Sequence, residues 1–118
     1  MQIDDPDLAA TLAGSDADRL PFGVILLDER LAITGYNRAE AEISGLEPRS
    51  VLGKRLFTDV APCMNTPEIR ARIDSATPLD ETVSYMLSLR MRMTPVRIRI
   101  IVDPATPLRA VCIRKNAP

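Results

Sequence analysis

Histidine is absent from this chain of 118 residues, and no other feature of the composition excludes as many functions. Without an imidazole there is no Ser-His-Asp or Cys-His catalysis, no histidine-ligated haem and none of the usual zinc sites. The reactive side chains that remain are two cysteines, two tyrosines and the carboxylates. We therefore do not expect an enzyme.

Aromatic residues and cysteines are also scarce. The chain has two Phe, two Tyr, no Trp and two Cys. A core built mainly from Leu, Ile, Val and Met has few rings, so Tyr36 either packs in that core or has a special role. Cys63 and Cys112 are fewer than an extracellular disulfide framework normally contains, which indicates reduced thiols.

A clear excess of positive charge is missing as well. Lys and Arg total 15, Asp and Glu total 16, and the balance argues against a nucleic-acid partner. No apolar run approaches the roughly 20 residues that span a bilayer, and no signal-peptide pattern opens the chain. We expect a cytoplasmic protein that binds no membrane. The charge is uneven, because residues 1–20 sum to −4 and the remainder to +3.

The length suits one domain with a single core. We expect residues 1–19 to form a short acidic N-terminal cap, with a helix over residues 7–13 that Gly14 ends. Residues 20–118 are expected to form the domain itself. It opens with an apolar run at residues 22–27 that is typical of a buried strand.

The middle of the chain alternates strand, turn and helix signals. Residues 31–36 return as the second strand of a hairpin. Asn37 is a suitable N-cap for a helix over residues 38–43, and Gly45 for its C-cap. Another helical turn is expected at residues 48–52, a partly buried loop at residues 56–63 and a helix at residues 67–75. Thr66 is the expected cap of the last helix, with Pro67 at its first position.

The last third of the chain is rich in Val, Ile, Leu and Met and predicts three strands, at residues 81–93, 96–103 and 108–115. Thr94-Pro95 and residues 104–107 are the expected turns. The order is strand, strand, three helices, then three strands. This predicts an α+β protein with a five-stranded antiparallel sheet and helices inserted after strand 2. The pattern resembles the PAS fold, in which helices and sheet enclose a ligand pocket.

Four arginines alternate with apolar residues in the expected strands, so they should project from one sheet face as a positive patch: Arg90, Arg92, Arg97 and Arg99. The patch serves either solubility alone or the docking of the acidic lead, Asp4, Asp5 and Asp7.

Three side chains outside the core pattern offer a ligand-binding set. Tyr36 supplies a phenol donor, Glu40 a carboxylic acid donor and Cys63 a covalent anchor. Tyr36 and Glu40 are four residues apart, and from a strand end into a helical turn their side chains can point the same way. Each also has an ordinary interpretation: a free cysteine is commonly a small buried hydrophobe, and we interpret Cys112 in that way.

Several segments of the sequence resemble photoactive yellow protein, over about residues 20–115. The block at Cys63 is the most specific of them. They are Leu20-Pro21-Phe22-Gly23-Val24-Ile25, Tyr36-Asn37-Arg38-Ala39-Glu40, Val51-Leu52-Gly53-Lys54, Asp59-Val60-Ala61-Pro62-Cys63 and Met93-Thr94-Pro95.

The resemblance implies a covalent chromophore, p-coumaric acid (4-hydroxycinnamic acid), bound as a thioester to Cys63. It implies that Tyr36 and Glu40 hydrogen-bond the buried phenolate oxygen and that Ser44 supports Tyr36. Three further positions complete the expected site: Pro62, beside the anchor; Met93, near the chromophore; and Leu46, where the family commonly has an arginine that lids the pocket. A buried phenolate requires strong donors, and Glu40 has to stay protonated to be one.

The function that the resemblance implies is that of a blue-light photoreceptor, monomeric or weakly dimeric. Trans-cis isomerisation, proton transfer and partial unfolding would signal to a downstream protein whose identity is unknown. The main alternative is a chromophore-free PAS module for ligand sensing or dimerisation. In a third interpretation Cys63 is an enzymatic nucleophile, but no histidine activates its thiol.

Overall fold

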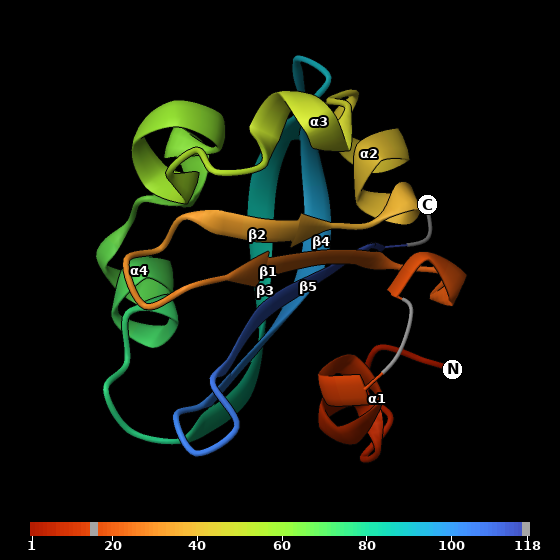
Figure 1. Cartoon of the computed structure of the whole chain (residues 1–118). Helices are drawn as coiled ribbons and strands as arrows, with labels where there is room; N and C mark the ends of the chain where they lie inside the picture. Colours follow the sequence, from red (N-terminus) through yellow and green to blue (C-terminus); the bar gives the residue numbers. More distant parts are fainter. Residues whose placement is uncertain (15–16, 117–118) are drawn as a thin grey trace.

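The computed structural model describes residues 1–14 and 17–116 (Figure 1). Residues 15–16, in the expected N-terminal cap, and residues 117–118, at the end of the expected domain, lie outside the described residues. No helix in the described ranges is long and apolar enough to cross a membrane.

Five antiparallel strands form one sheet in the order β2-β1-β5-β4-β3. They are β1 (Gly23–Leu27), β2 (Ile33–Tyr36), β3 (Leu79–Leu89), β4 (Arg92–Asp103) and β5 (Leu108–Lys115). The buried apolar runs form β1 and β5 in the middle of the sheet, because a strand covered on both faces needs apolar residues at consecutive positions. The expected α+β fold with helices inserted after strand 2 is confirmed.

Short helices connect and cover the sheet: α1 (Leu8–Gly14), η1 (Ala17–Arg19), α2 (Arg38–Ser44), α3 (Pro48–Val51), η2 (Leu56–Val60), η3 (Pro62–Met64) and α4 (Pro67–Ile73). Asn37 caps α2 by accepting a hydrogen bond from the Glu40 amide, and Gly45 ends it with φ 81°. Both caps agree with the sequence prediction. The expected loop at residues 56–63 is instead wound into the π-turn η2 and the 3-10 turn η3.

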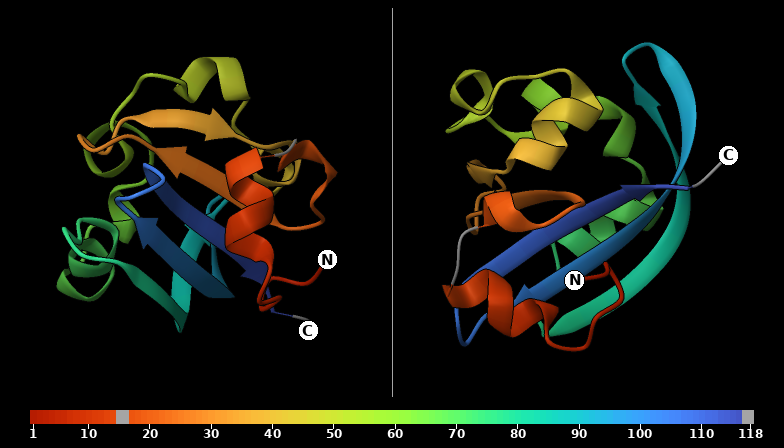
Figure 2. Two further views of the ribbon diagram at one scale, coloured as in Figure 1. Left: turned by 60° about the horizontal axis from the view of Figure 1, so that its bottom comes forward. Right: turned by 90° about the vertical axis from the view of Figure 1, so that its right-hand side faces the viewer.

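Two apolar clusters lie on opposite faces of the sheet. The larger cluster lies between the sheet and the segment α2–α4, with Ile98, Ile100 and Leu56 among its members. In the smaller cluster Leu8 and Leu12 of α1 pack against Cys112 and Ile101. Figure 2 shows α1 on the opposite side of the sheet from α2, α3 and α4. The N-terminal segment is therefore part of the folded core.

The turn between β3 and β4 lies at Arg90 and Met91, and the expected turn at Thr94-Pro95 is wrong. Arg90 and Met91 both have positive φ, 50° and 67°, as a two-residue turn of type I′ requires. Pro95 fits inside β4 because its carbonyl faces β5, where it accepts a hydrogen bond from the Asn116 amide at 3.0 Å. Its missing N–H therefore removes no bond to β3.

The four alternating arginines do not form one positive patch. Arg90 lies in the turn and donates from Nε and Nη2 to the Glu42 carbonyl. Arg92 and Arg97 are exposed, whereas Arg99 is buried under the N-terminal segment. Arg99 donates to the carbonyls of Ile3 and Asp5 at 3.0 and 2.6 Å. The acidic lead does lie on this face, but Arg99 holds its backbone.

Candidate functional site

A cavity of about 90 Å³ lies between the sheet and the turns that follow α2. Its wall includes five of the seven residues expected in the site, Tyr36, Glu40, Ser44, Leu46 and Cys63. Aliphatic side chains form most of the remaining wall: Ile25, Val60, Ala61, Met64, Leu87, Leu89 and Ile113. An apolar cavity with a few convergent polar groups is the usual form of a small-molecule site.

The polar end of the cavity is a linked set of three side chains. The Tyr36 hydroxyl lies 2.7 Å from Ser44 Oγ and 3.5 Å from Glu40 Oε2. A hydroxyl has one proton, so the shorter contact to Ser44 is the effective hydrogen bond. The Leu46 amide also donates to Ser44 Oγ, at 3.1 Å. Tyr36 is thereby held in place without using Glu40 as its acceptor.

Glu40 is 3% exposed, and its Oε1 has no hydrogen-bond partner among the described residues. Burial raises the pKa of this carboxyl to about 8, and the hydrogen bond with Tyr36 opposes the shift. Burial also raises the pKa of Tyr36 above its ordinary value, with the Glu40 charge as the next cause. Both groups are therefore neutral at pH 7, and both can donate a hydrogen bond to an anion in the cavity.

Gly23 leaves the space that the Glu40 carboxyl occupies. A Cβ at this position would lie 2.0 Å from Glu40 Oε1 and 3.2 Å from Glu40 Cα. Helix α2 can approach β1 this closely only because the strand has a glycine here.

Asn37 fixes the start of α2 against β1, a role beyond the expected helix cap. Its Oδ1 accepts from the amides of Glu40 and Val24, at 2.9 and 2.8 Å. Its Nδ2 donates to the carbonyls of Phe22 and Ala17, both at 2.9 Å. All four bonds set the direction in which Tyr36 and Glu40 enter the cavity.

Cys63 lies on the turn η3 at the exposed side of the cavity. The Tyr85 hydroxyl of β3 donates to the Cys63 carbonyl at 3.2 Å and lies 2.9 Å from the Thr66 hydroxyl. Thr66 makes no side-chain cap for α4, contrary to expectation, because its hydroxyl faces Tyr85. The sequence pattern assigned no role to Tyr85; its being one of two tyrosines in the chain was the available signal.

Two residues expected in the site lie outside the cavity wall. Met93 is 66% exposed, because the turn at residues 90–91 puts its side chain on the outer face of β4, opposite Ser88. The expectation that it lies beside the ligand is therefore wrong for this structure. Pro62 begins the turn η3 and acts only through the position of Cys63. Leu46 lines the cavity and is 39% exposed.

Cys112 is buried in β5, as expected of a small hydrophobe. Burial raises the pKa of its thiol to about 12, so it is not a competing nucleophile.

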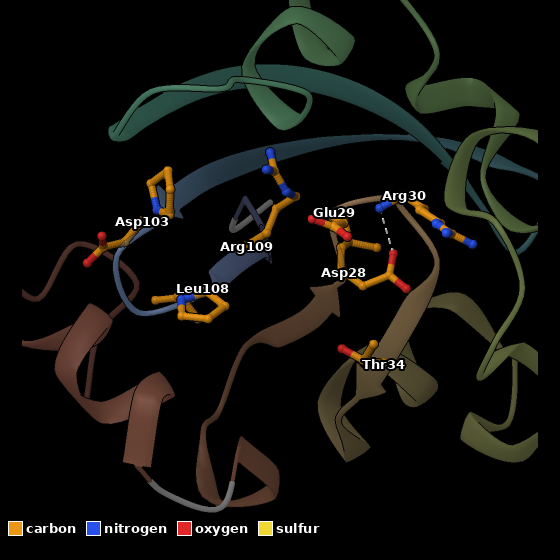
Figure 3. A pocket seen from close by; sticks show the side chains of 10 residues that line it. Asp28, Glu29, Arg30, Thr34, Asp103, Leu108 and Arg109 are labelled. Atoms are coloured by element: carbon orange, nitrogen blue, oxygen red, sulfur yellow. Dashed lines mark hydrogen bonds between the residues drawn. The ribbon is translucent and has the colours of Figure 1, made fainter.

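A larger cleft of about 550 Å³ lies between the β1–β2 turn and the β4–β5 loop (Figure 3). Two of its charged side chains, Asp28 and Arg109, are engaged in local structure. Asp28 accepts from the amides of Arg30 and Ala32, both at 2.9 Å. Arg109 donates to the carbonyls of Ile73 and Ser75. The smaller cavity, which has an unpartnered carboxyl oxygen, is therefore the better candidate.

The sequence of the chain matches known proteins over most of its length. Residues 15–113 match the PAS fold family. Photoactive yellow protein from Rhodothalassium salexigens is 34% identical over 102 residues, which cover 84% of this chain and 82% of that protein. This chain belongs to the photoactive yellow protein family. The family member from Halochromatium salexigens is also 34% identical, over 77% of this chain and 75% of its own length.

The solved structures include the photoactive yellow protein domain of the sensor histidine kinase Ppr from Rhodospirillum centenum. It is 31% identical, has a TM-score of 0.81 and covers 90% of this chain and 98% of its own. A PAS domain of an HTR-like protein from Haloarcula marismortui has a TM-score of 0.67 at 12% identity, over 93% of this chain and 98% of its own, and shares the fold alone.

Proposed function

We propose that this photoactive yellow protein relative is a cytoplasmic blue-light photoreceptor that binds p-coumaric acid as a thioester on Cys63. The observation that carries the proposal is Glu40, a buried carboxyl with an unpartnered oxygen beside Tyr36, in a cavity whose exposed side holds the Cys63 thiol. A carboxyl so placed is costly without a ligand to complete its hydrogen bonds.

The residues fit this chromophore. A phenolate oxygen at the polar end of the cavity would accept hydrogen bonds from Tyr36 and from protonated Glu40, which offsets its desolvation. Tyr36 would turn its one proton from Ser44 to the phenolate, the Ser44 hydroxyl would then donate to the Tyr36 oxygen and keep it oriented, and the aliphatic wall would exclude water. When bound, the group supplies absorption of blue light and a trans-cis isomerisation.

Glu40 is the proton donor in the proposed signal. With the chromophore bound, Glu40 would supply its proton to the phenolate oxygen once its hydrogen bond is strained, and would itself remain as a buried carboxylate without a partner. An isolated buried charge costs several kcal/mol, which is comparable with the stability of a small domain. Partial unfolding follows, and we expect the N-terminal segment to take part and to alter binding to a downstream signalling protein.

The proposal is tested by incubation of the chain with activated p-coumarate, followed by mass measurement and absorption spectroscopy. We expect one adduct per chain and a yellow colour. Cys63→Ser should lose the adduct, and Cys112→Ser, the matched control, should keep it. Equal labelling of both cysteines, or an adduct without colour, would contradict the site assignment.

Glu40→Gln tests the polar end of the cavity in the loaded protein. A neutral amide is a weaker donor than a carboxylic acid, so it stabilises the phenolate less. We expect a red-shifted band and loss of the light-driven proton transfer. An unchanged spectrum would mean that Glu40 does not contact the chromophore.

A chain that takes up no p-coumarate would be better described as a PAS module for ligand sensing or dimerisation. The exposed Leu46 at the cavity favours this alternative, because it offers no positive charge to a phenolate. We propose no enzymatic role, which turnover of an activated ester at Cys63 would contradict.

A further inference from the structure

The two edges of the sheet are covered differently. The β2 edge is already paired with the chain that follows α3. The Ile33 amide donates to the Lys54 carbonyl at 2.9 Å, and the Gly53 amide to the Ile33 carbonyl at 2.8 Å. A bridge between Ala32 and Arg55 extends this contact. This short edge therefore offers few free backbone groups.

The β3 edge has no such cover. It is 11 residues long and pairs with β4 without a register shift from Leu79 to Leu89. No strand of the described chain lies beyond it. Its sequence contains no Pro, Lys or Gly, and no bulge interrupts it, so the protections of an edge strand are limited to the charges of Asp80 and Glu81 at its start. Figure 2 shows β3 as a long outer strand.

Alternate residues of β3 present their backbone to the free edge. Pro95 pairs with Met86 but directs its carbonyl toward β5, so this pair exchanges no backbone hydrogen bonds. The N–H and C=O of Met86 therefore point away from β4. Backbone direction alternates along a strand, so the N–H and C=O of Ser84 and Thr82, two and four residues earlier, also point away from β4. All three side chains are exposed. Together these residues form an open template for a further strand.

We propose that β3 pairs antiparallel with β3 of a second copy of this chain, about a two-fold axis at Ser84. Such a pairing puts Ser84 opposite the partner's Ser84 and Thr82 opposite the partner's Met86. It converts the exposed edge into the centre of a continuous ten-stranded sheet. The pairing needs no chromophore and goes beyond the photoreceptor proposal.

The charges of β3 favour an antiparallel second copy. The strand carries its charges only at its start, where Asp80 is paired with Arg99 and Glu81 with Arg72, and residues 82–89 carry none. An antiparallel two-fold arrangement puts Asp80 and Glu81 opposite the partner's uncharged Ser88 and Leu87. Met86, which is 47% exposed, gains an apolar neighbour in the Thr82 methyl of the partner. A parallel arrangement would put like charges side by side.

The test is the molar mass of the chain, 13.0 kDa as a monomer, by sedimentation equilibrium from about 10 µM to 1 mM, a range suited to a small interface. We expect the mass to rise toward twice that value. Met86→Lys should raise the dissociation constant about tenfold or more, because a lysine protects an edge strand from pairing. Leu52→Lys is the matched control, since Leu52 is also 47% exposed but lies away from β3; it should leave the dimer unchanged.

Ser84→Pro is a second variant, because it removes an N–H that points to the partner and none that bonds to β4. It should also abolish the dimer, and Ser84→Ala should keep it. Far-UV circular dichroism checks that each variant is folded. A mass that stays at the monomer value throughout would overturn the proposal. So would a dimer that survives Met86→Lys in a folded protein, since another surface would then form it.

Hydrogen exchange locates the contact residue by residue in the unmodified chain. The amides of Thr82, Ser84 and Met86 should become protected as the concentration rises. Those of Val83 and Tyr85, which face β4, should be protected at every concentration. Protection that is independent of concentration at all five positions would contradict pairing through this edge.

Discussion

Glu40 and Arg99 are both buried, on opposite faces of the same sheet, and their hydrogen bonding differs. Arg99 is 6% exposed and donates to both carboxylate oxygens of Asp80, at 2.8 and 2.7 Å, and to two backbone carbonyls. These interactions with Asp80 raise the pKa of Arg99. Glu40 has one long contact to Tyr36 and one oxygen without a partner. A fully hydrogen-bonded buried group stabilises the fold, whereas a buried group with an unpartnered oxygen costs stability, and the proposed chromophore site uses the second kind.

Arg99→Ala removes the fully hydrogen-bonded buried group and should have the largest effect on stability. The carbonyls of Ile3 and Asp5 lose their donor, so we expect a loss of about 3 kcal/mol in the free energy of unfolding. Urea denaturation followed by circular dichroism measures it. Arg97→Ala, two residues along the same face and exposed, is the control and should change stability by less than about 0.5 kcal/mol. Equal effects would mean that the N-terminal segment does not depend on Arg99.

The pH dependence of stability tests Glu40, the buried group with an unpartnered oxygen. The pKa of Glu40 is about 8 in the folded chain and near 4.5 as its ordinary value, so unfolding releases a proton between these pH values. The free energy of unfolding should therefore fall as pH rises, by about 2 kcal/mol from pH 5.5 to 7.5.

Glu40→Gln should flatten this slope, because a glutamine does not titrate. Glu42→Gln on the same helix is the control, since Glu42 is exposed. If the slope is the same in the wild type and in both variants, Glu40 is ionised in the folded chain and the proposed donor role is lost.

Tyr85→Phe tests whether the Tyr85 hydroxyl positions the turn that carries the Cys63 thiol. Loss of the hydroxyl removes the bond to the Cys63 carbonyl, so the turn η3 should loosen at a cost of about 1 kcal/mol. A bulky maleimide should then modify Cys63 faster, and Cys112 should stay unmodified in the folded protein. Thr66→Val, which removes the other hydroxyl partner of Tyr85, serves as a comparison that keeps the Cys63 contact. An unchanged labelling rate in Tyr85→Phe would exclude a positioning role.

Leu46→Arg has the smallest expected effect. An added positive charge at the cavity should stabilise a bound phenolate, and an anion that is better stabilised has a lower pKa. Acid bleaching of the yellow band should therefore shift to lower pH, by about half a unit at this partly exposed position. Leu46→Gln, a polar but uncharged change, should leave the midpoint in place. Coincident midpoints for Leu46→Arg and the wild type would mean that position 46 does not act on the bound group.

Local signals in the sequence predicted the caps of α2 at Asn37 and Gly45, the strands around Ile25 and Ile98 and the burial of Cys112. The predictions of caps and strands succeed because caps depend on neighbours within a few residues and strand faces on alternation. The resemblance added the set of Tyr36, Glu40, Ser44 and Cys63, which line one cavity; their role toward a chromophore stays a prediction.

The turn at Arg90 and Met91 could not be predicted in this way, because neither residue favours positive φ. The register of β3 against β4, in which Leu89 pairs with Arg92, places the turn at these two residues, and that register extends to the pair of Leu79 with Val102, far along the chain from the turn. Because the turn lies at residues 90–91, Met93 belongs to β4 and its side chain lies on the outer face of the sheet, outside the expected site.

The sequence by itself determined which groups this chain has for chemistry: the Tyr36 phenol, the Glu40 carboxyl and the Cys63 thiol within a short segment, and no imidazole. Tertiary structure alone decided how they differ from ordinary side chains. Arg99 is buried because a segment 96 residues away packs over it, and the Cys63 turn is tied to Tyr85 across 22 residues. Burial and hydrogen-bond partners are set by such long-range packing, and they separate Arg99, which is fully hydrogen-bonded, from Glu40, whose Oε1 has no partner among the described residues.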